Sequence, residues 1–267
     1  MRKLIIYILF FICLFSCEEE TDWNLASIVI PRLVVDGMIT NQRGRQEVTL
    51  TLPVKNINDI PVPVSGAFVA ITDQEKVYFL TEIIEKPGTY VTADTVQGVV
   101  GKIYTLYIRI AEFEFVANSY MVPVEPLKNP FIVPCDKQEN FYHLIPESEG
   151  DPFMMFIFIN WINTPFCKDD HSCHERINHY HLNSIDVNEF FKPDKEIICF
   201  PSGSQIIRRK FSLNPDHQRF IRSMLMETEW RGGIFDVQRG NILSNMSPGA
   251  IGYFAASTVV TDTLYIE

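Results

Sequence analysis

The stretch IYTLYIRI, residues 103–110, has the most regular alternation in the chain. Its apolar face would carry Tyr104, Leu106, Ile108 and Ile110, and its other face Thr105, Tyr107 and Arg109. Because successive side chains of a strand point to opposite faces, this period of two predicts a β-strand with one buried face.

Similar runs flank this stretch and are separated by turn residues such as Pro87-Gly88, Gly98 and Ala111-Glu112. The further predicted strands cover residues 33–39, 48–52, 67–71, 77–83, 89–92 and 113–117. Short strands with turns at regular intervals are typical of a β-sandwich. We therefore expect an immunoglobulin-like or transthyretin-like β-sandwich over residues 31–124.

Prolines 123, 126, 130 and 134 interrupt the alternation and suggest a boundary near residue 125. Residues 153–159 are apolar on both faces, as in a central buried strand, and residues 250–255 and 259–266 alternate again. A helix is predicted near 215–230, because Asn214 can cap it and Pro215 suits its first turn. Residues 125–267 should thus form a β-rich C-terminal region with one packed α-helix, and the chain should be mainly β.

The basic cluster Arg208-Arg209-Lys210 lies in a strand-like stretch of this second region. Lysines and arginines commonly protect an exposed sheet edge from pairing with other strands. We expect this cluster to be a solvated edge.

The N-terminus has the three-part plan of a secretory signal. Arg2 and Lys3 precede an apolar run over residues 4–15, which is too short to span a bilayer because a spanning helix needs about 20 residues. The following residues LFSC, 14–17, resemble the lipobox of bacterial lipoproteins. The resemblance implies a lipoprotein signal peptide over residues 1–16 and a lipid anchor, such as palmitate, on Cys17.

Three carboxylates, Glu18, Glu19 and Glu20, follow the expected lipidation site. They resemble the acidic export signal of surface-displayed lipoproteins of the Bacteroidota, which implies an outer-membrane protein facing the cell surface, the periplasmic face being the alternative. A plainer interpretation is that the glutamates keep an acidic tether, residues 17–30, solvated.

The composition favours a globular protein outside the cytoplasm. Hydrophobic residues make up 46% of the chain, and loss of Arg2 and Lys3 with the signal changes the net charge from −10 to −12. Such a charge opposes nucleic acid as a partner. The chain lacks the glycine-rich phosphate loop, the dinucleotide fingerprint and the Gly-x-Ser-x-Gly nucleophile motif. We expect a protein that is not an enzyme and needs no cofactor.

Four cysteines remain after Cys13 leaves with the signal and Cys17 takes lipid. Four thiols in an oxidising compartment favour two disulfides, for which three connectivities exist. We expect Cys167 with Cys173, closing a short polar loop, and Cys135 with Cys199.

The segment CKDDHSCHERINHYHL, residues 167–182, is the one constellation that suggests chemistry. It contains His171, His174, His179 and His181, and the last two should face the same way on a strand. Imidazole and thiolate are the usual zinc ligands, so a metal site or a metal-dependent hydrolase is one alternative. The spacing matches no zinc finger or His-Glu-x-x-His helix, and the plainer interpretation is a disulfide-closed loop with solvated histidines.

A second candidate site lies in the closing segment WRGGIFDVQRGNILSNMSPGAIGYFAAS, residues 230–257. Its glycines and apolar residues favour tight turns folded over the sandwich. Trp230, Arg231 and Arg239 are candidates for a contact surface, because aromatic and arginine side chains contribute disproportionately to interfaces.

This closing segment, together with LVVDGMIT, VTLTLPV, VSGAFVAITD, GTYV and YTLYI, resembles the domain of unknown function family 4249 from about residue 30 to the C-terminus. The resemblance implies an outer-membrane lipoprotein, often encoded beside a TonB-dependent receptor, and it supplies no catalytic residues. We expect a lipid-anchored, non-enzymatic accessory that caps an outer-membrane β-barrel receptor or presents a ligand to it, the ligand being unknown. The alternatives are the surface metal protein above and a structural adhesin, which a sandwich fits equally well.

Overall fold

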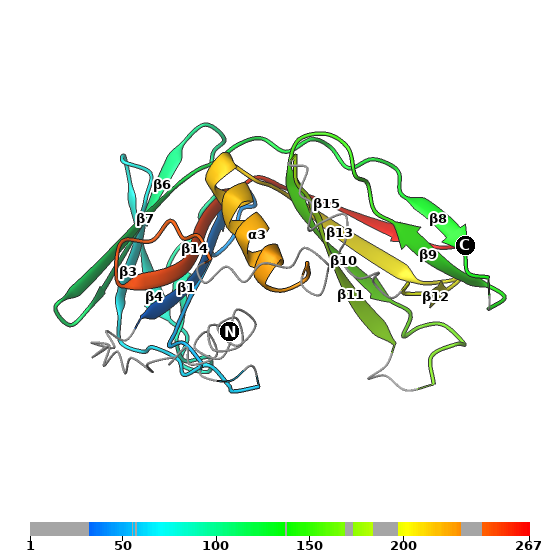
Figure 1. The fold of residues 1–267 in the computed structure, drawn as a ribbon, viewed down its shortest axis with the longest axis horizontal. Helices are drawn as coiled ribbons and strands as arrows, with labels where there is room; N and C mark the ends of the chain where they lie inside the picture. Colours follow the sequence, from blue (N-terminus) through cyan, green and yellow to red (C-terminus); the bar gives the residue numbers. More distant parts are fainter. Residues whose placement is uncertain are drawn as a thin grey trace, which may run out of the picture. The chain divides into compact units, whose positions relative to one another are not determined.

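The computed structural model describes residues 32–54, 56, 58–136, 138–168, 173–183, 197–230 and 242–267. Eight strands form its first sheet, in the order β14-β1-β2-β5-β4-β3-β6-β7 (Figure 1). They are β1 (Leu33–Thr40), β2 (Glu47–Thr51), β3 (Phe68–Thr72), β4 (Val77–Glu82), β5 (Thr89–Thr92), β6 (Ile103–Ile110), β7 (Phe113–Tyr120) and β14 (Ala250–Ser257). The strands predicted from the period of two are thus confirmed within a few residues.

The first sheet curls so that its two edge strands meet. The Ala256 amide of β14 donates to Ser119 Oγ of β7 at 2.9 Å, and Asn245 Nδ2 donates to the main-chain oxygens of Asn118 and Phe254 at 3.0 and 2.8 Å. Alternate residues of every strand, including Leu106 and Ile108 of β6, face one shared core. Two halves of one sheet therefore enclose a core, which confirms the predicted sandwich.

Strand β14 comes from the far end of the chain and pairs in parallel with β1, from Leu33 opposite Ala250 to Thr40 opposite Ser257. At Gly252 the backbone has φ +97°, and a Cβ there would lie 2.0 Å from the carbonyl oxygen of Val35. Only glycine permits this close approach. Residues 250–257 thus complete the first sheet, although they lie in the range expected to form the C-terminal region.

A second sheet has the order β11-β10-β13-β15, and a third has the order β12-β9-β8. Their strands are β8 (Phe131–Pro134), β9 (Phe141–Ile145), β10 (Phe153–Asn160), β11 (His174–His181), β12 (Phe200–Pro201), β13 (Gln205–Ser212) and β15 (Val259–Tyr265). One face of the second sheet, with Ile157 and Ile159 of β10, packs with Leu144 and Phe200 of the third sheet. Strand β10 lies between two neighbours, as the apolar run predicted.

The predicted helix is α3 (Pro215–Glu227). It begins at Asn214, whose Oδ1 accepts from the His217 amide at 2.8 Å, so this cap satisfies one of the amides that a helix start leaves unpaired. The apolar side of α3 packs over one end of the second sheet, where Met154 and Phe211 lie beneath it. For the described residues, the prediction of a mainly β chain with one packed helix is confirmed.

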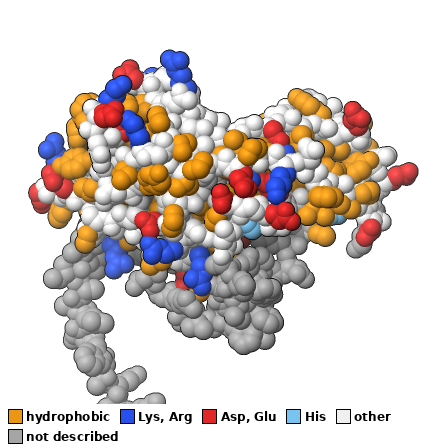
Figure 2. Space-filling model, turned by 90° about the horizontal axis from the view of Figure 1, so that it is seen from above, with side chains coloured by type: hydrophobic (Ala, Val, Ile, Leu, Met, Phe, Trp, Pro, Cys, Tyr) orange, Lys and Arg blue, Asp and Glu red, His pale blue; other side chains and the backbone are white. Residues whose placement is uncertain are grey.

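Among the described residues, no helix has the length and apolar content that a bilayer crossing requires. Acidic and basic side chains are interspersed over the face drawn in Figure 2, which is typical of a solvated surface.

Candidate functional site

The expected lipidation site, Cys17, and the export signal Glu18, Glu19 and Glu20 lie outside the described residues. The first described residue is Arg32, directly before β1.

Two disulfides lie at the ends of the second and third sheets, and both predicted pairings are confirmed. Cys135 pairs with Cys199 across 64 residues, with 6.4 Å between the Cα atoms. Cys167 pairs with Cys173 across six residues, with 5.6 Å between the Cα atoms. Because both sulfurs of each pair are bonded to one another, these cysteines are not thiolate ligands for a metal.

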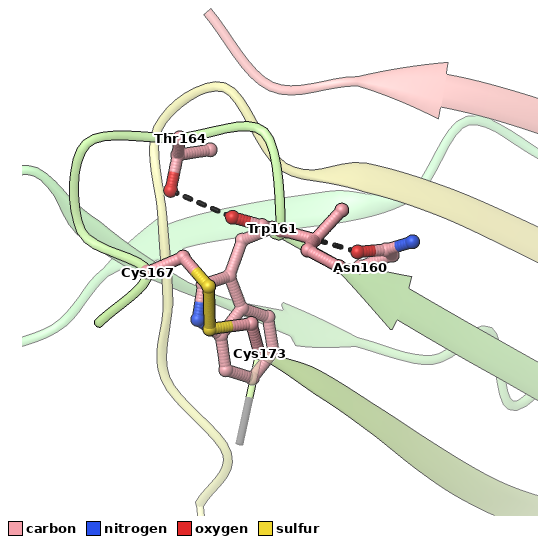
Figure 3. Close-up of a disulfide and its surroundings, with 6 residues drawn as sticks. Asn160, Trp161, Thr164, Cys167 and Cys173 are labelled. Carbon is pink, nitrogen blue, oxygen red and sulfur yellow. Dashed lines mark hydrogen bonds between the residues drawn. A yellow bond between two sulfur atoms is a disulfide. The ribbon is translucent and has the colours of Figure 1, made fainter. Parts of the chain in front are cut away.

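The shorter disulfide closes the connection between β10 and β11 (Figure 3). The Trp161 amide donates to the carbonyl of Cys173 at 2.9 Å, and the Thr164 hydroxyl donates back to the carbonyl of Trp161 at 2.8 Å. At the end of β10, Asn160 Oδ1 accepts from the Ile162 amide at 2.9 Å. These bonds fix the start of the loop, so the disulfide holds an already ordered turn against the sheet.

The histidines of β11 bind main-chain oxygens of the segment before β10. His179 and His181 face the same side, as predicted, and their Nε2 atoms lie 2.8 and 3.2 Å from the carbonyls of Glu147 and Gly150. A carbonyl only accepts, so each Nε2 carries the hydrogen and has no free electron pair for a metal. Both rings also pack on Phe153, with centroids 5.8 and 5.3 Å away.

The other two candidate metal ligands lie elsewhere. His174 is exposed at the far end of β11, and His171 falls outside the described residues. Within the part of the chain that the structure describes, no three His, Cys, Asp or Glu side chains come together as metal ligands do. Of the candidate ligands, His179 and His181 bind the 147–150 segment.

That segment carries a buried ion pair. Glu147 Oε1 lies 2.7 Å from Lys210 Nζ, and the two side chains are 8% and 1% exposed. Neither of these two atoms has a further hydrogen-bond partner among the described residues, but Glu147 Oε2 accepts from the Lys128 amide at 3.2 Å. Lys210 Nζ also lies 4.4 Å from the centroid of the Phe153 ring. The pair thus joins β13 to the turn that the histidines hold.

A second charged pair lies two residues earlier on β13. Arg208 Nε donates to Asp262 Oδ1 of β15 at 3.0 Å, its Nη2 pairs with Oδ2 of the same carboxylate, and its Nη1 donates to the Lys128 carbonyl at 2.9 Å. The prediction that Arg208-Arg209-Lys210 forms a solvated edge was wrong, because β13 lies between β10 and β15 and buries Arg208 and Lys210. In the structure Ile206, Arg208 and Lys210 are buried and alternate with half-buried neighbours, an alternation that the residue types IIRRK do not show.

Trp230 is buried rather than available as a contact residue. It is 4% exposed, packs with Leu225 and Met226 at the end of α3, and donates its main-chain amide to the Leu225 carbonyl at 2.8 Å. Its partners in the candidate contact surface, Arg231 and Arg239, lie outside the described residues. The indole therefore serves the packing of the helix.

Sequence reasoning missed a buried aromatic stack between α3 and β14. The His217 ring lies 4.7 Å from the Tyr253 ring at an angle of 13°, and the Phe220 ring lies 4.8 Å from the Tyr253 ring at an angle of 24°. Burial lowers the pKa of His217 to about 3, so this ring is neutral, and it raises the pKa of Tyr253. The Nδ1 atom of His217 has no hydrogen-bond partner among the described residues.

Comparisons with known proteins identify the family of the chain but no reaction or ligand. No curated protein matches the chain. Among solved structures, the chicken CNTN1 FN1-FN3 domains are similar at 12% identity and a TM-score of 0.29, covering 69% of this chain and 62% of that one. The family model described as "Domain of unknown function (DUF4249)" matches residues 18–263. The chain, with its curled first sheet and a disulfide beside each of the second and third sheets, belongs to this family.

Proposed function

We propose that the chain is a lipid-anchored outer-membrane lipoprotein that faces the cell surface. The observation that carries the proposal is the junction LFSCEEE, residues 14–20, which places a cysteine between a short apolar run and three carboxylates. A thiol at this point is the natural acceptor for acyl chains, and more than one chain gives a stable anchor.

The position of the first strand supports an anchored fold. Arg32, the first described residue, follows Cys17 by 15 residues. Fully extended, this connection spans at most about 50 Å, at roughly 3.4 Å per residue. The described residues from Arg32 onward would therefore begin within that distance of the membrane, close enough to touch a neighbouring membrane protein.

We further propose that the protein is a non-enzymatic accessory that presents a ligand to a TonB-dependent receptor or caps it. Several described polar side chains support a binding role over catalysis: His179 and His181 bind carbonyls, Glu147 and Asp262 are paired with Lys210 and Arg208, and the four cysteines are in disulfides.

Affinity capture tests the partnership. A C-terminal tag on the full chain should recover a β-barrel receptor from detergent-solubilised outer membrane, and the Cys17→Ser variant should recover much less because it is not held at the membrane. Repeated capture without any β-barrel protein would refute the partnership.

Protease treatment of intact cells tests the orientation. The native chain should be digested, whereas a variant with Glu18, Glu19 and Glu20 all changed to Ala should stay lipidated but protected inside the cell. Equal digestion of both would show that the glutamates are only a solvated tether.

A further inference from the structure

The outer face of the second sheet continues beyond helix α3 as a grid of side chains that the described residues leave accessible. The register of β11, β10, β13 and β15 sets its rows. Three rows lie beyond the helix: Asn178, Phe156, Arg209 and Thr261; Arg176, Phe158, Ile207 and Thr263; His174, Asn160, Gln205 and Tyr265. All twelve side chains are half-buried or exposed.

Aromatic rings and an arginine form the centre of this grid. The Arg176 guanidinium lies 4.6 Å from the centroid of Phe156 and 5.3 Å from that of Phe158. Its Nε donates to Asn178 Oδ1 at 3.0 Å, which holds the guanidinium across both rings. A stacked, exposed arginine keeps its remaining N–H groups for an anion.

A second arginine lies in the next row. Arg209 is 5.3 Å from the centroid of Phe211, and its Nη2 donates to Gln42 Oε1 at 3.1 Å. The amide of Gln42 also reaches Thr261 Oγ1 at 3.2 Å. The two arginines are thus held in defined positions on one face, by rings and by amides.

Two hollows adjoin at the end of the grid. One has a volume of about 440 Å³ and is lined mainly by apolar groups around Phe158 and Ile207, with Arg176 at its side. The other, about 180 Å³, is lined by Asn160, Asn163, Gln205 and Tyr265. They share Asn160 and Gln205, and together they have the size of a small-molecule site.

The charge of this face is opposite to that of the chain. The three rows carry two arginines and a histidine but no carboxylate, whereas the whole chain has a net charge of −10. Glu175 is the one acidic side chain among the described residues that line the hollows. A basic face on an acidic protein favours an anionic ligand.

We propose that this face binds an acidic saccharide, a sugar that carries carboxylate or sulfate groups. Arginines match the anionic groups, amide side chains both donate to and accept from hydroxyls, and the apolar hollow lined by Phe158 and Ile207 suits the C–H face of a sugar ring. An acidic peptide would use the arginines and the amides, but its carboxylate side chains offer no flat C–H face to the hollow at Phe158 and Ile207. The inference rests on the proposed ligand-presenting function and names the class of that ligand.

Binding is measured with soluble protein that starts at residue 18, so the result does not depend on the anchor or on a receptor. Calorimetry with polygalacturonate oligomers and with dextran sulfate tests the carboxylate and sulfate forms, and neutral dextran is the control. We expect binding to at least one acidic polymer at 150 mM salt and none to dextran. The proposed partnership with a TonB-dependent receptor is tested separately, because only a failed receptor capture would refute it.

Two variants locate the site. Arg176→Gln should weaken binding at least tenfold, whereas Arg109→Gln, which removes an arginine 5.2 Å from the Phe68 ring on the first sheet, should leave it unchanged. Phe158→Ala should also weaken binding, and circular dichroism should show each variant folded. The proposal would be overturned if neither acidic polymer bound, or if the two arginine changes had equal effects. Equally tight binding of polyglutamate would also overturn it, because the face would then be assigned to an acidic protein segment.

Discussion

Removal of one partner of the buried Glu147–Lys210 pair should destabilise the protein far more than removal of both. In Lys210→Met, a carboxylate with 8% exposure loses its cation at 2.7 Å and keeps only the Lys128 amide at 3.2 Å. Breaking a buried pair in this way costs about 3–5 kcal/mol, because the remaining charge stays buried without compensation. The substitution also removes the contact between the Lys210 ammonium group and the Phe153 ring.

The double variant Lys210→Met, Glu147→Leu should recover most of this loss and differ from the native chain by about 1 kcal/mol, since apolar groups of similar volume often replace a buried pair at little cost. The two single changes should therefore be strongly non-additive. Lys128→Met is the control: its pair with Glu149 is 3.2 Å long but 51% and 83% exposed, so the cost should be below about 1 kcal/mol.

Urea denaturation of the soluble, disulfide-intact protein, followed by tryptophan fluorescence and circular dichroism, gives the free energy of unfolding for each variant. The comparison requires similar slopes with denaturant concentration. If Lys210→Met cost no more than Lys128→Met, or if the double variant were as unstable as the sum of the singles, the buried pair would not join β13 to the 147–150 turn as described.

Three further predictions concern stability. Burial lowers the pKa of His217 to about 3, so only the unfolded chain takes up a proton at this residue between about pH 6.5 and pH 3. The free energy of unfolding should therefore fall by about 2 kcal/mol from pH 7 to pH 5 through this group. In urea titrations, His217→Phe should make the free energy of unfolding less dependent on pH. Gly252→Ala should cost about 3 kcal/mol or more in the same assay, because its Cβ would meet the Val35 carbonyl; an unchanged midpoint would contradict the β1–β14 register. Changing Cys135 and Cys199 to Ala should cost about 4 kcal/mol, roughly twice the loss for the shorter bridge, since the closed loop is longer, and equal losses would refute this ranking.

Local sequence patterns predicted most of the fold, because a strand with one buried face shows its period within a few residues. The run at residues 103–110 became β6 with the same bounds, and the Asn214-Pro215 start became α3. Pairing between distant segments leaves no such local signal. The parallel partnership of β14 with β1 depends on Gly252 and on contacts across more than 200 residues, so it could not be foreseen.

The candidate sites were harder to predict than the fold. Charged residues in a strand usually mark a solvated face, and the exception at Lys210 depends on Glu147, which comes from a turn 63 residues earlier. The histidines of β11 have metal-like spacing, but the carbonyls that they bind belong to that same turn. The disulfides were predictable because only four cysteines remained and the short spacing favoured one pair.

The lipid on residue 17 is the central claim of this account, and intact-mass spectrometry of the protein purified from membranes tests it most directly. The account predicts a mature chain that begins at Cys17 and carries the added mass of acyl chains, all of it lost in a Cys17→Ser variant. A mature chain that begins at another residue, or one that begins at Cys17 without added mass, would contradict it.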